Sequence, residues 1–475
     1  MRSVLPVALL AGGFVLAGCG TVEERAAPPP ASATVRAKPQ PAPRPAPVPG
    51  RAHPGPQAVL VTVVDGDTNA RVPGAVVSIG HHTARTNRHG VALVRLPHRG
   101  ALVTVARKTG YGTRAVRLAF RTHPMSTMRI YRPALQWTMY GASPTRTQTQ
   151  TRIRVRPPFR VVWSRGLGSL VEFPAVVTDG VAYVANARGT VRALDMRTGT
   201  VIWRHDTPHG KMASSPAVWG TVLVVHGMDG HVWVLRRSDG RLLWDYDVDS
   251  PVESSPVVDH GVDVFGAWDG TITALDLRTH RVRWRRNDGC KITSSAAVAG
   301  GTLYIGDYCG RLLALSPASG RLRWSGAVNG RIYGTPAVAA GRVFVPSSDG
   351  GSLTAFSTGG RFLWRRLIGS YVYSSPATWD GRVFFGAYNG VFYAVSAASG
   401  GTLWTVGVGG PISGAAVVVD GVAYAGSFSH RIVGVGARSG RVLLDFPHGE
   451  YVPVSGSGQR LLLHGFSRVW GVVHR

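Results

Sequence analysis

The sequence predicts an all-β fold in which an eight-bladed β-propeller follows a small N-terminal β-sandwich. The propeller is predicted by a repeated unit of 40 residues, with one step of 42, and by four short alternating apolar runs inside each unit. Four short strands in a repeat of this length are typical of one propeller blade. The seven units that align begin at Pro174, Pro216, Pro256, Ala296, Pro336, Pro376 and Ala416.

Turn residues separate the four runs of each unit. Asp229-Gly230, Asp269-Gly270 and Asn389-Gly390 are strong hairpin signals. After a second turn, a large aromatic residue recurs that we expect to pack each blade against its neighbour. Leu444 holds this position in the seventh unit, so that interface should be packed less well. The recurring residues are Trp203, Trp244, Trp284, Trp324, Trp364 and Trp404.

The two ends of the repeat region predict a composite closing blade. Residues 456–474 supply only three strand-like runs, whereas residues 159–163 resemble an isolated fourth strand with Trp163 at the tryptophan position. Joining them gives an eighth four-stranded blade and leaves no strand edge exposed. The propeller is therefore assigned to residues 159–475.

The first residues carry an export signal. Arg2 precedes an apolar stretch over residues 4–16, as in a secretory signal peptide, which we assign to residues 1–18. Leu16-Ala17-Gly18-Cys19 resembles the lipobox of bacterial lipoproteins. The resemblance implies that Cys19 is lipidated, so that the chain is anchored in the cell envelope, on the extracytoplasmic face of a bacterial membrane. Residues 19–56, rich in Pro and Ala, are interpreted as a tether.

Residues 57–132 are predicted to form the β-sandwich, because short apolar alternations are separated by Gly, Pro, Asn and Asp. Val72-Pro73-Gly74 and Lys108-Thr109-Gly110-Tyr111 resemble the carboxypeptidase regulatory-like family, which implies a spacer or adhesion module without catalysis. Its histidines lack further ligands at zinc spacing, so no metal site is assigned. Residues 133–158 form a bridge whose Trp137 and Tyr140 are expected to dock on the propeller.

The net charge of the chain indicates which classes of partner it favours. The 53 Lys and Arg residues outnumber the 25 Asp and Glu residues, for a formal net charge of +28. This balance favours anionic partners, although the codon usage of a genome rich in G and C gives the same bias. Because the basic residues are spread along the chain without a nucleic-acid-binding motif, no nucleic-acid partner is expected.

The repeat is similar to the pyrroloquinoline-quinone (quinoprotein) repeat family over residues 159–475. Within that family its short units resemble the BamB-type lipoproteins, which are outer-membrane assembly scaffolds, although the preceding sandwich and tether depart from that pattern. The resemblance implies a membrane-anchored binding scaffold rather than an enzyme, with no cofactor.

The alternative is a quinone-dependent oxidoreductase. In the quinoprotein dehydrogenases, adjacent cysteines form a disulfide over the quinone, beside a calcium ion and long inserted loops. This chain has no adjacent cysteines, and its regular period leaves no room for insertions. The acidic string Asp245, Asp247 and Asp249 lacks the spacing of a calcium loop and is interpreted as a solvated strand face.

One face of the propeller is predicted to bind a partner. It carries the loops that enter the first strands and the turns between second and third strands, and it collects aromatic and basic residues where small polar ones are usual. Such residues are enriched in interface hot spots, so we expect an envelope protein or an anionic glycan to bind there. The alternative is that they pack on adjoining loops or on the bridge. The candidates are Trp268, Tyr308, Tyr333, Tyr371, Tyr373, Tyr388, Phe428, Lys211, Lys291 and Arg331.

Two cysteines besides Cys19 are expected to form a disulfide. Cys290 lies in a loop that enters a first strand, and Cys309 takes the hairpin position that Asp269 holds one unit earlier. These positions share one face of one blade, so a Cα separation of about 5.5–6 Å is within reach.

Overall fold

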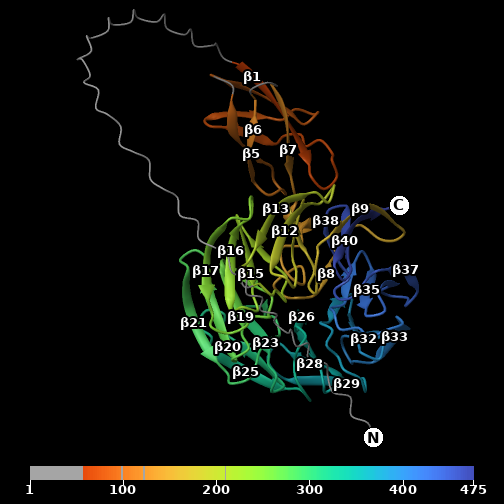
Figure 1. The fold of residues 1–475 in the computed structure, drawn as a ribbon. Helices are drawn as coiled ribbons and strands as arrows, with labels where there is room; N and C mark the ends of the chain where they lie inside the picture. The colour runs from red at the N-terminus through yellow and green to blue at the C-terminus, as the bar shows by residue number, and fades with distance from the viewer. Residues whose placement is uncertain (1–56, 98–99, 121–123, 209) are drawn as a thin grey trace, which may run out of the picture. The chain divides into compact units, whose positions relative to one another are not determined.

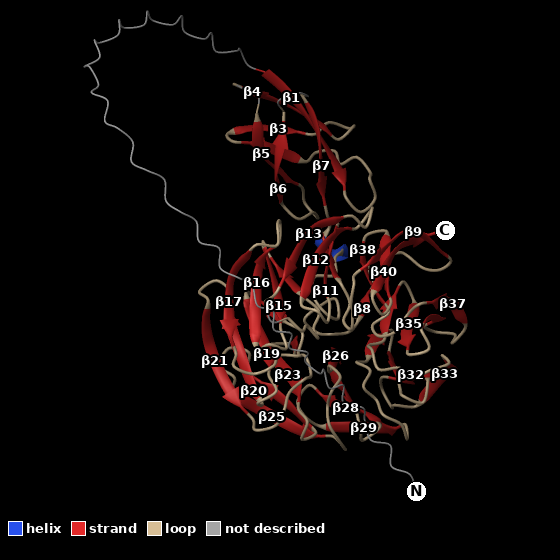
Figure 2. Ribbon diagram, viewed as in Figure 1, coloured by secondary structure: helices blue, strands red, loops and turns tan. Residues whose placement is uncertain are grey.

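The computed structural model describes residues 57–475, except residues 98–99, 121–123 and 209. In this part of the chain the regular structure is β-strand apart from one 3₁₀ turn, η1 (Pro133–Leu135), which confirms the all-β fold class (Figure 2). No helix among these residues is long and apolar enough to cross a membrane. The predicted signal peptide, Cys19 and the predicted tether lie outside the described residues.

The first seven strands form two sheets that share one apolar core. The sheets have the orders β4-β1-β7 and β3-β2-β5-β6, and β1 pairs antiparallel with β4 and parallel with β7. Val59, Val61 and Val63 alternate along β1 and are buried in this core, as the period of two in a strand requires. The strands are β1 (Gln57–Asp65), β2 (Val76–Ile79), β3 (His82–Arg85), β4 (Val91–Leu96), β5 (Ala101–Arg107), β6 (Arg114–Ala119) and β7 (Met125–Ile130).

Within the described residues from 159 onward the chain forms eight sheets, of which seven are successive four-stranded meanders. Each meander runs from an inner first strand to an outer fourth strand, and neighbouring first strands contact one another around a ring (Figure 1). This arrangement is the predicted propeller. The first strands are β10 (Val176–Thr178), β14 (Ala217–Trp219), β18 (Val257–Asp259), β22 (Ala297–Ala299), β26 (Ala337–Ala339), β30 (Ala377–Trp379) and β34 (Val417–Val419).

The second and third strands of each meander are joined by the hairpins that the sequence predicts. The second strands are β11 (Val181–Ala185), β15 (Val222–His226), β19 (Val262–Gly266), β23 (Thr302–Gly306), β27 (Arg342–Ser347), β31 (Arg382–Gly386) and β35 (Val422–Ser427). The third are β12 (Thr190–Asp195), β16 (His231–Arg236), β20 (Thr271–Asp276), β24 (Arg311–Leu315), β28 (Ser352–Ser357), β32 (Val391–Ser396) and β36 (Arg431–Gly436). The fourth are β13 (Val201–Asp206), β17 (Leu242–Asp247), β21 (Arg281–Asn287), β25 (Leu322–Ala327), β29 (Phe362–Leu367), β33 (Thr402–Gly407) and β37 (Val442–Pro447).

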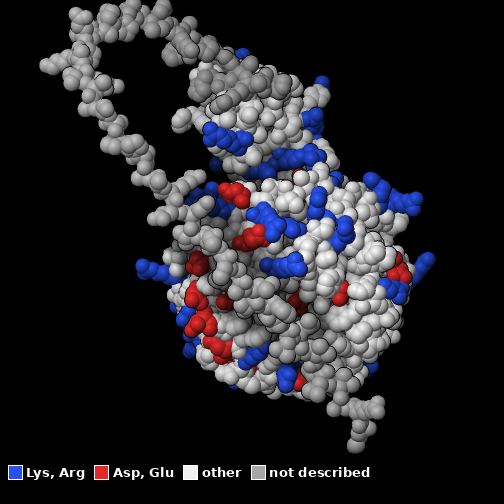
Figure 3. Space-filling view, in the orientation of Figure 1, with Lys and Arg blue, Asp and Glu red and all other residues white. Residues whose placement is uncertain are grey.

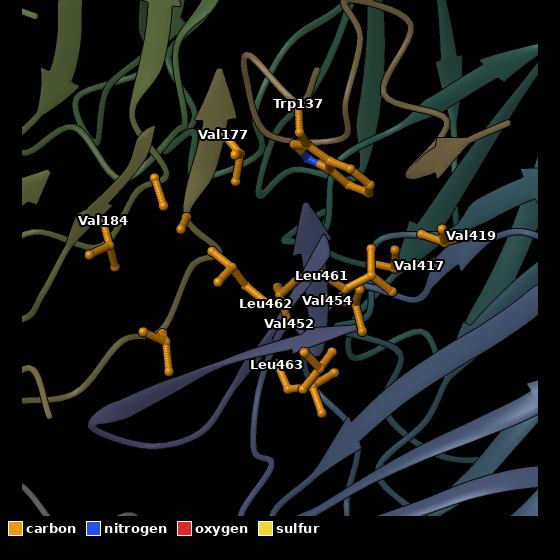
Figure 4. Close-up of a cluster of buried hydrophobic side chains, with 14 of the residues drawn as sticks. Trp137, Val177, Val184, Val417, Val419, Val452, Val454, Leu461, Leu462 and Leu463 are labelled. Atoms are coloured by element: carbon orange, nitrogen blue, oxygen red, sulfur yellow. The ribbon is translucent and has the colours of Figure 1, made fainter. Parts of the chain in front are cut away.

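The remaining sheet joins the two ends of the propeller. It consists of β38 (Val454–Ser457), β39 (Arg460–His464), β40 (Arg468–His474) and β9 (Phe159–Gly166), and β40 pairs antiparallel with β9. This pairing confirms the predicted composite sheet. Beside it, Trp137, Val177, Val417 and Leu461 belong to one buried cluster that spans the closing sheet and its two neighbours (Figure 4).

The recurring tryptophans pack each sheet against the next. The indole Nε1 of Trp284 donates a 2.8 Å hydrogen bond to the carbonyl of Pro317, and that of Trp364 donates one of 3.2 Å to Ala397. The ring of Trp364 covers Gly400 of the next sheet, where φ is +71° and an added Cβ would lie 2.6 Å from the ring. The turn glycine is therefore required both by its positive φ and by the aromatic ring above it at Gly199, Gly240, Gly320, Gly360, Gly400 and Gly440. In the third sheet His280 holds this position at a φ of +58° and stacks on Trp244.

The bridge follows the inner strands around the ring. Trp137, which is fully buried, pairs with Val177 of β10, and β8 (Thr149–Gln150) runs parallel to β34. Between these points the bridge carbonyls accept hydrogen bonds from the edge amides of first strands. The acceptor–donor pairs are Thr138 with Val218, Pro144 with Val298, Thr145 with Val338, Thr147 with Thr378, and Gln148 with Val418, at 2.8–2.9 Å. The bridge thus pairs inner edges that would otherwise lack partners.

Arg146 fixes the middle of the bridge. Its side chain is fully buried, and its guanidinium donates to the carbonyls of Ala296 at 2.8 Å and Pro256 at 2.7 Å, and also to that of Tyr140 within the bridge. Burial lowers the pKa of Arg146 to about 10, so the group remains charged at neutral pH. One side chain thereby joins the bridge to two neighbouring blades.

Candidate functional site

A cavity of about 240 Å³ lies where the loops that enter the first strands converge. Its floor is the bridge residue Tyr140, whose hydroxyl makes a 3.0 Å hydrogen bond with Ser375 Oγ. We call the face of the propeller that carries the loops entering the first strands the loop face. The bridge pairs with the inner strand edges beneath this face, so the cavity is a closed-ended pocket in it. The lining side chains include Glu172, Phe173, Glu253, Thr293, Tyr333, Tyr373, Tyr388, Ser413, Phe428 and Tyr451.

Glu253 is the most strongly held polar group of the pocket. Its side chain is only 9% exposed, and each carboxylate oxygen accepts one hydrogen bond. Tyr333 Oη donates to Oε1 at 2.6 Å, and Trp268 Nε1 donates to Oε2 at 3.1 Å. Burial, and then the charge of Glu253, raise the pKa of Tyr333 well above its usual value, so its hydroxyl stays a donor.

Glu172 supplies a second carboxyl group to the same pocket. Burial raises its pKa to about 7, the charge of Glu253 adds to this shift, and Lys211 opposes it. At neutral pH Glu172 is therefore divided between its acid and carboxylate forms.

Aromatic rings form a continuous wall on one side of the pocket, which we call the aromatic wall. Ring centroids lie 5.5 Å apart for Tyr333 and Tyr373, 5.2 Å for Tyr373 and Tyr388, 5.8 Å for Tyr388 and Phe428, and 5.3 Å for Phe428 and Tyr451. Most pairs meet edge to face, the arrangement that the ring quadrupoles favour.

The basic residues of the loop face belong to the other part of the rim. Lys291 Nζ lies 3.2 Å from the centroid of Trp268 and 5.2 Å from that of Tyr308, and the guanidinium of Arg331 lies 5.8 Å from Tyr308. Burial lowers the pKa of Lys291. Lys211 is exposed. Lys291 and Arg331 thus interact with rings of the chain itself.

The ten predicted residues thus divide into three groups. Tyr333, Tyr373, Tyr388 and Phe428 line the pocket, whereas Trp268, Tyr308, Lys291 and Arg331 form a cation–π cluster beside it. Tyr371 and Lys211 remain exposed at the rim. The alternative, that these aromatic residues pack on adjoining loops, has one instance in the hydrogen bond between Tyr333 and Glu253.

Glu172, Glu253, Thr293 and Ser413 line the pocket but were not predicted from the sequence. The signal for three of them was present, because the position three residues before each unit is one column of the repeat. In five of the seven units that column holds Glu253, Thr293, Tyr333, Tyr373 and Ser413, all of which line the pocket, whereas Val171 and Ala213 in the first two units do not. Only the tyrosines of this column stand out by residue type as candidates for an interface. Glu172 lies one position later in its own unit and has no such signal.

Cys290 and Cys309 form a disulfide in the fourth sheet. Their Cα atoms lie 5.9 Å apart, and 19 positions separate them in the sequence. The bond ties the loop that enters this sheet to its first hairpin, beside Lys291 and Tyr308.

The pocket residues do not fit a quinone with its calcium ion. Among the described residues there is no group of three His, Cys, Asp or Glu side chains placed to hold a metal ion. The disulfide joins cysteines that are distant in sequence, and the donor set of the pocket is two carboxyl groups, two free hydroxyl groups and phenols.

Comparison with known families places the repeat region. The sequence profile of the family described as outer membrane protein assembly factor BamB matches residues 158–268, 187–324, 268–367 and 351–450, which together cover more than half of the chain. The chain belongs to the BamB family. A BamB protein of Pseudomonas aeruginosa is 34% identical over 93 residues, and one of Bordetella pertussis is 30% identical over 84 residues.

These matches cover only part of each protein. They span 19% and 18% of this chain and 23% and 21% of the two BamB relatives. The crystal structure of BamB from Moraxella catarrhalis superposes with a TM-score of 0.57 at 18% identity, covering 67% of this chain and 98% of that one. The quinohemoprotein alcohol dehydrogenase of Comamonas testosteroni superposes with a TM-score of 0.63 at 16% identity, over 71% and 80%. Identities this low establish the shared propeller fold alone.

Proposed function

We propose that this BamB-family chain is a non-enzymatic scaffold of the bacterial cell envelope, whose loop face binds a partner protein during outer membrane protein assembly. The observation that carries the proposal is the exposed aromatic rim of that face. Trp268, Tyr371 and Tyr388 are 37%, 50% and 36% exposed. Exposed aromatic residues around a central hollow are typical of protein interfaces.

The charge pattern favours a protein over an acidic glycan as the partner. Figure 3 shows basic side chains dispersed over the visible surface, with acidic ones among them. On the loop face, Lys291 and Arg331 lie over rings of the chain itself, and Glu172 and Glu253 are present at its centre. A polyanion would meet both signs of charge there, whereas a folded protein can match both.

The non-enzymatic part of the proposal is supported by the pocket itself. Its residues do not fit the quinone and calcium set of the dehydrogenases that share the fold. Glu253 is held by two aromatic donors, and the described residues that line the pocket include no Cys, His or Lys to form a nucleophile–base pair.

The rim is tested by replacing Tyr371 and Tyr388 with Ser. A strain that lacks the chain is complemented with this double variant, and its outer membrane β-barrel proteins are quantified by mass spectrometry. We expect a level close to that of the deletion strain. The matched control replaces Leu403 and Leu443, which are 49% and 44% exposed on the outer strands β33 and β37, with Ser. Full complementation by the rim variant would contradict the proposal.

The proposed membrane anchor is tested separately. Cys19→Ser should move the chain from the membrane fraction to the soluble extracytoplasmic fraction and remove the acyl mass from its N-terminal peptide. An unchanged membrane association would contradict the anchor and leave the rim result standing.

A further inference from the structure

We propose that the pocket at the centre of the loop face binds an organic cation, an ammonium or guanidinium group, between Glu172, Glu253 and the aromatic wall. The inference deepens the proposed function and rests on it in one respect, which is that the loop face is the binding surface. It assigns a ligand class to a site for which the basic composition of the chain suggested the opposite charge.

Neither carboxyl group of the pocket is paired directly with a cation of the chain, although the charge of Lys211 lowers the pKa of Glu172 and the charge of Glu253 raises that of Lys291. In a chain of net charge +28, the ion pairs formed by the described residues involve neither Glu172 nor Glu253. Two carboxyl groups that share one cavity repel each other when both are ionised, which is costly unless a cation enters between them. A bound cation removes this repulsion.

The rings of the aromatic wall are not covered by cations of the described part of the chain. Among the described residues, no Lys or Arg lies over Tyr373, Tyr388, Phe428 or Tyr451, although rings elsewhere on the propeller carry cations. The negative faces of such rings attract an ammonium or guanidinium group, and this attraction reaches about 2 kcal/mol in a desolvated site. The same chemistry is already used at the rim, where Lys291 lies over Trp268.

Two hydroxyl groups of the pocket residues have no hydrogen-bond partner among the described residues. Thr293 is 5% exposed and lines the pocket, yet its Oγ1 has no hydrogen-bond partner among the described residues. Ser413 Oγ lines the same pocket and also lacks one. Buried hydroxyl groups are usually satisfied, and a hydroxyl can donate or accept, so these two can accept hydrogen bonds from a ligand that donates them. Ammonium and guanidinium groups are such donors.

The size of the pocket limits the ligand. A volume of about 240 Å³ lies below the ~300–1,000 Å³ of pockets for drug-sized ligands. It suits one head group with a short aliphatic stem. The cation is therefore either a small free amine or the side chain of a Lys or Arg residue that a partner protein inserts.

The experiment is calorimetric titration of the purified full-length chain at pH 8 with n-butylammonium and with arginine amide. The neutral control is n-butanol and the anionic control is butyrate. We expect saturable binding of both cations and none of n-butanol. Glu253→Gln and Tyr373→Leu should each weaken binding at least tenfold. Asp349→Asn, which removes an exposed acid from its 3.6 Å contact with Arg331 at the rim, should leave binding unchanged. Equal binding by wild type and Glu253→Gln would overturn the inference, as would tighter binding of butyrate than of butylammonium.

A peptide arm distinguishes the two sources of the cation. A short peptide with one central Lys is compared with the same peptide carrying acetyl-lysine. Preference for the charged peptide over free butylammonium assigns the pocket to a partner side chain, and the reverse preference assigns it to a small amine. Loss of β-barrel assembly without loss of cation binding would overturn only the pocket's link to assembly. Absence of cation binding in a chain that still supports assembly would overturn only the inference about the pocket.

Discussion

The phenolic oxygen of Tyr333 lies 2.6 Å from Oε1 of Glu253, and this hydrogen bond joins two loops that are 80 residues apart in the chain. The loops enter the third and the fifth sheets of the propeller. Since Trp268 Nε1 donates to the other oxygen of Glu253 at 3.1 Å, two aromatic donors fix this carboxylate in the pocket lining. The pocket geometry thus depends on a contact that no single repeat contains.

Tyr333→Phe should destabilise the fold. The substitution keeps the ring and removes one donor from a buried carboxylate, which costs about 1.5–3 kcal/mol. The measurement is the midpoint of urea unfolding. Tyr371→Phe is the matched control, because this ring is 50% exposed. The two variants should differ clearly, and equal midpoints would show that the hydrogen bond to Glu253 contributes nothing.

Glu172 should make stability fall as the pH rises. Its pKa is about 7 in the folded chain, because of burial and the charge of Glu253, against 4.5 as its ordinary value. Between these values the unfolded chain has lost a proton that the folded chain keeps, so unfolding becomes more favourable as pH increases. The facing groups are Glu253, Lys211, Tyr333 and Tyr451.

Melting temperatures measured from pH 4 to pH 8 check this expectation. The melting temperatures of Glu172→Gln and the wild type should coincide near pH 4, where Glu172 is protonated in both the folded and the unfolded wild type. At pH 8 the variant should have the higher melting temperature. A constant difference across the range would mean that Glu172 does not titrate in this window.

The repeat period predicted most of the fold, because in a propeller each successive repeat along the chain forms the next sheet of the ring. The hairpins, the tryptophan column and the composite sheet all follow from spacing. The same logic explains Leu444. In the closing sheet the adjoining strands β40 and β9 come from opposite ends of the propeller, so no turn glycine exists for a tryptophan at position 444 to cover. The site was harder to predict, since its residues come from different repeats and differ in type.

The path of the bridge could not be read from the sequence. Residues 136–150 lack a strand-like alternation because their hydrogen bonds go to six different sheets and not to one neighbour. Arg146 is a further example. A basic residue in a polar segment is normally solvated, and the carbonyls of Tyr140, Ala296, Ser255 and Pro256 around Arg146 explain its complete burial.

Two glycines with the same backbone conformation allow the contribution of φ to the stability cost of a Gly→Ala substitution to be measured apart from the contribution of packing. Gly381 and Gly400 both have a φ of +71°, but an added Cβ meets nothing within 4 Å at Gly381 and the ring of Trp364 at Gly400. Gly381→Ala should cost about 1–2 kcal/mol, the left-handed penalty of an L-residue. Gly400→Ala should cost a further ~1–3 kcal/mol through overpacking. Equal decreases in the free energy of unfolding, measured with urea, would show that the ring of Trp364 moves aside at no cost in free energy.

Arg146→Met should loosen the bridge more than any substitution of an exposed bridge arginine. Methionine fills much of the volume but donates nothing, so the carbonyls of Ala296, Ser255 and Pro256 lose their donor inside the ring. Each buried carbonyl left unpaired costs about 1–3 kcal/mol. Hydrogen exchange should therefore accelerate over residues 136–150 and at the amides of Val298 and Val338, which bond to the bridge. Arg152→Met is the control, because Arg152 is exposed in the same segment. Unchanged exchange in Arg146→Met would mean that the backbone hydrogen bonds alone hold the bridge, and the floor of the pocket would then be independent of Arg146.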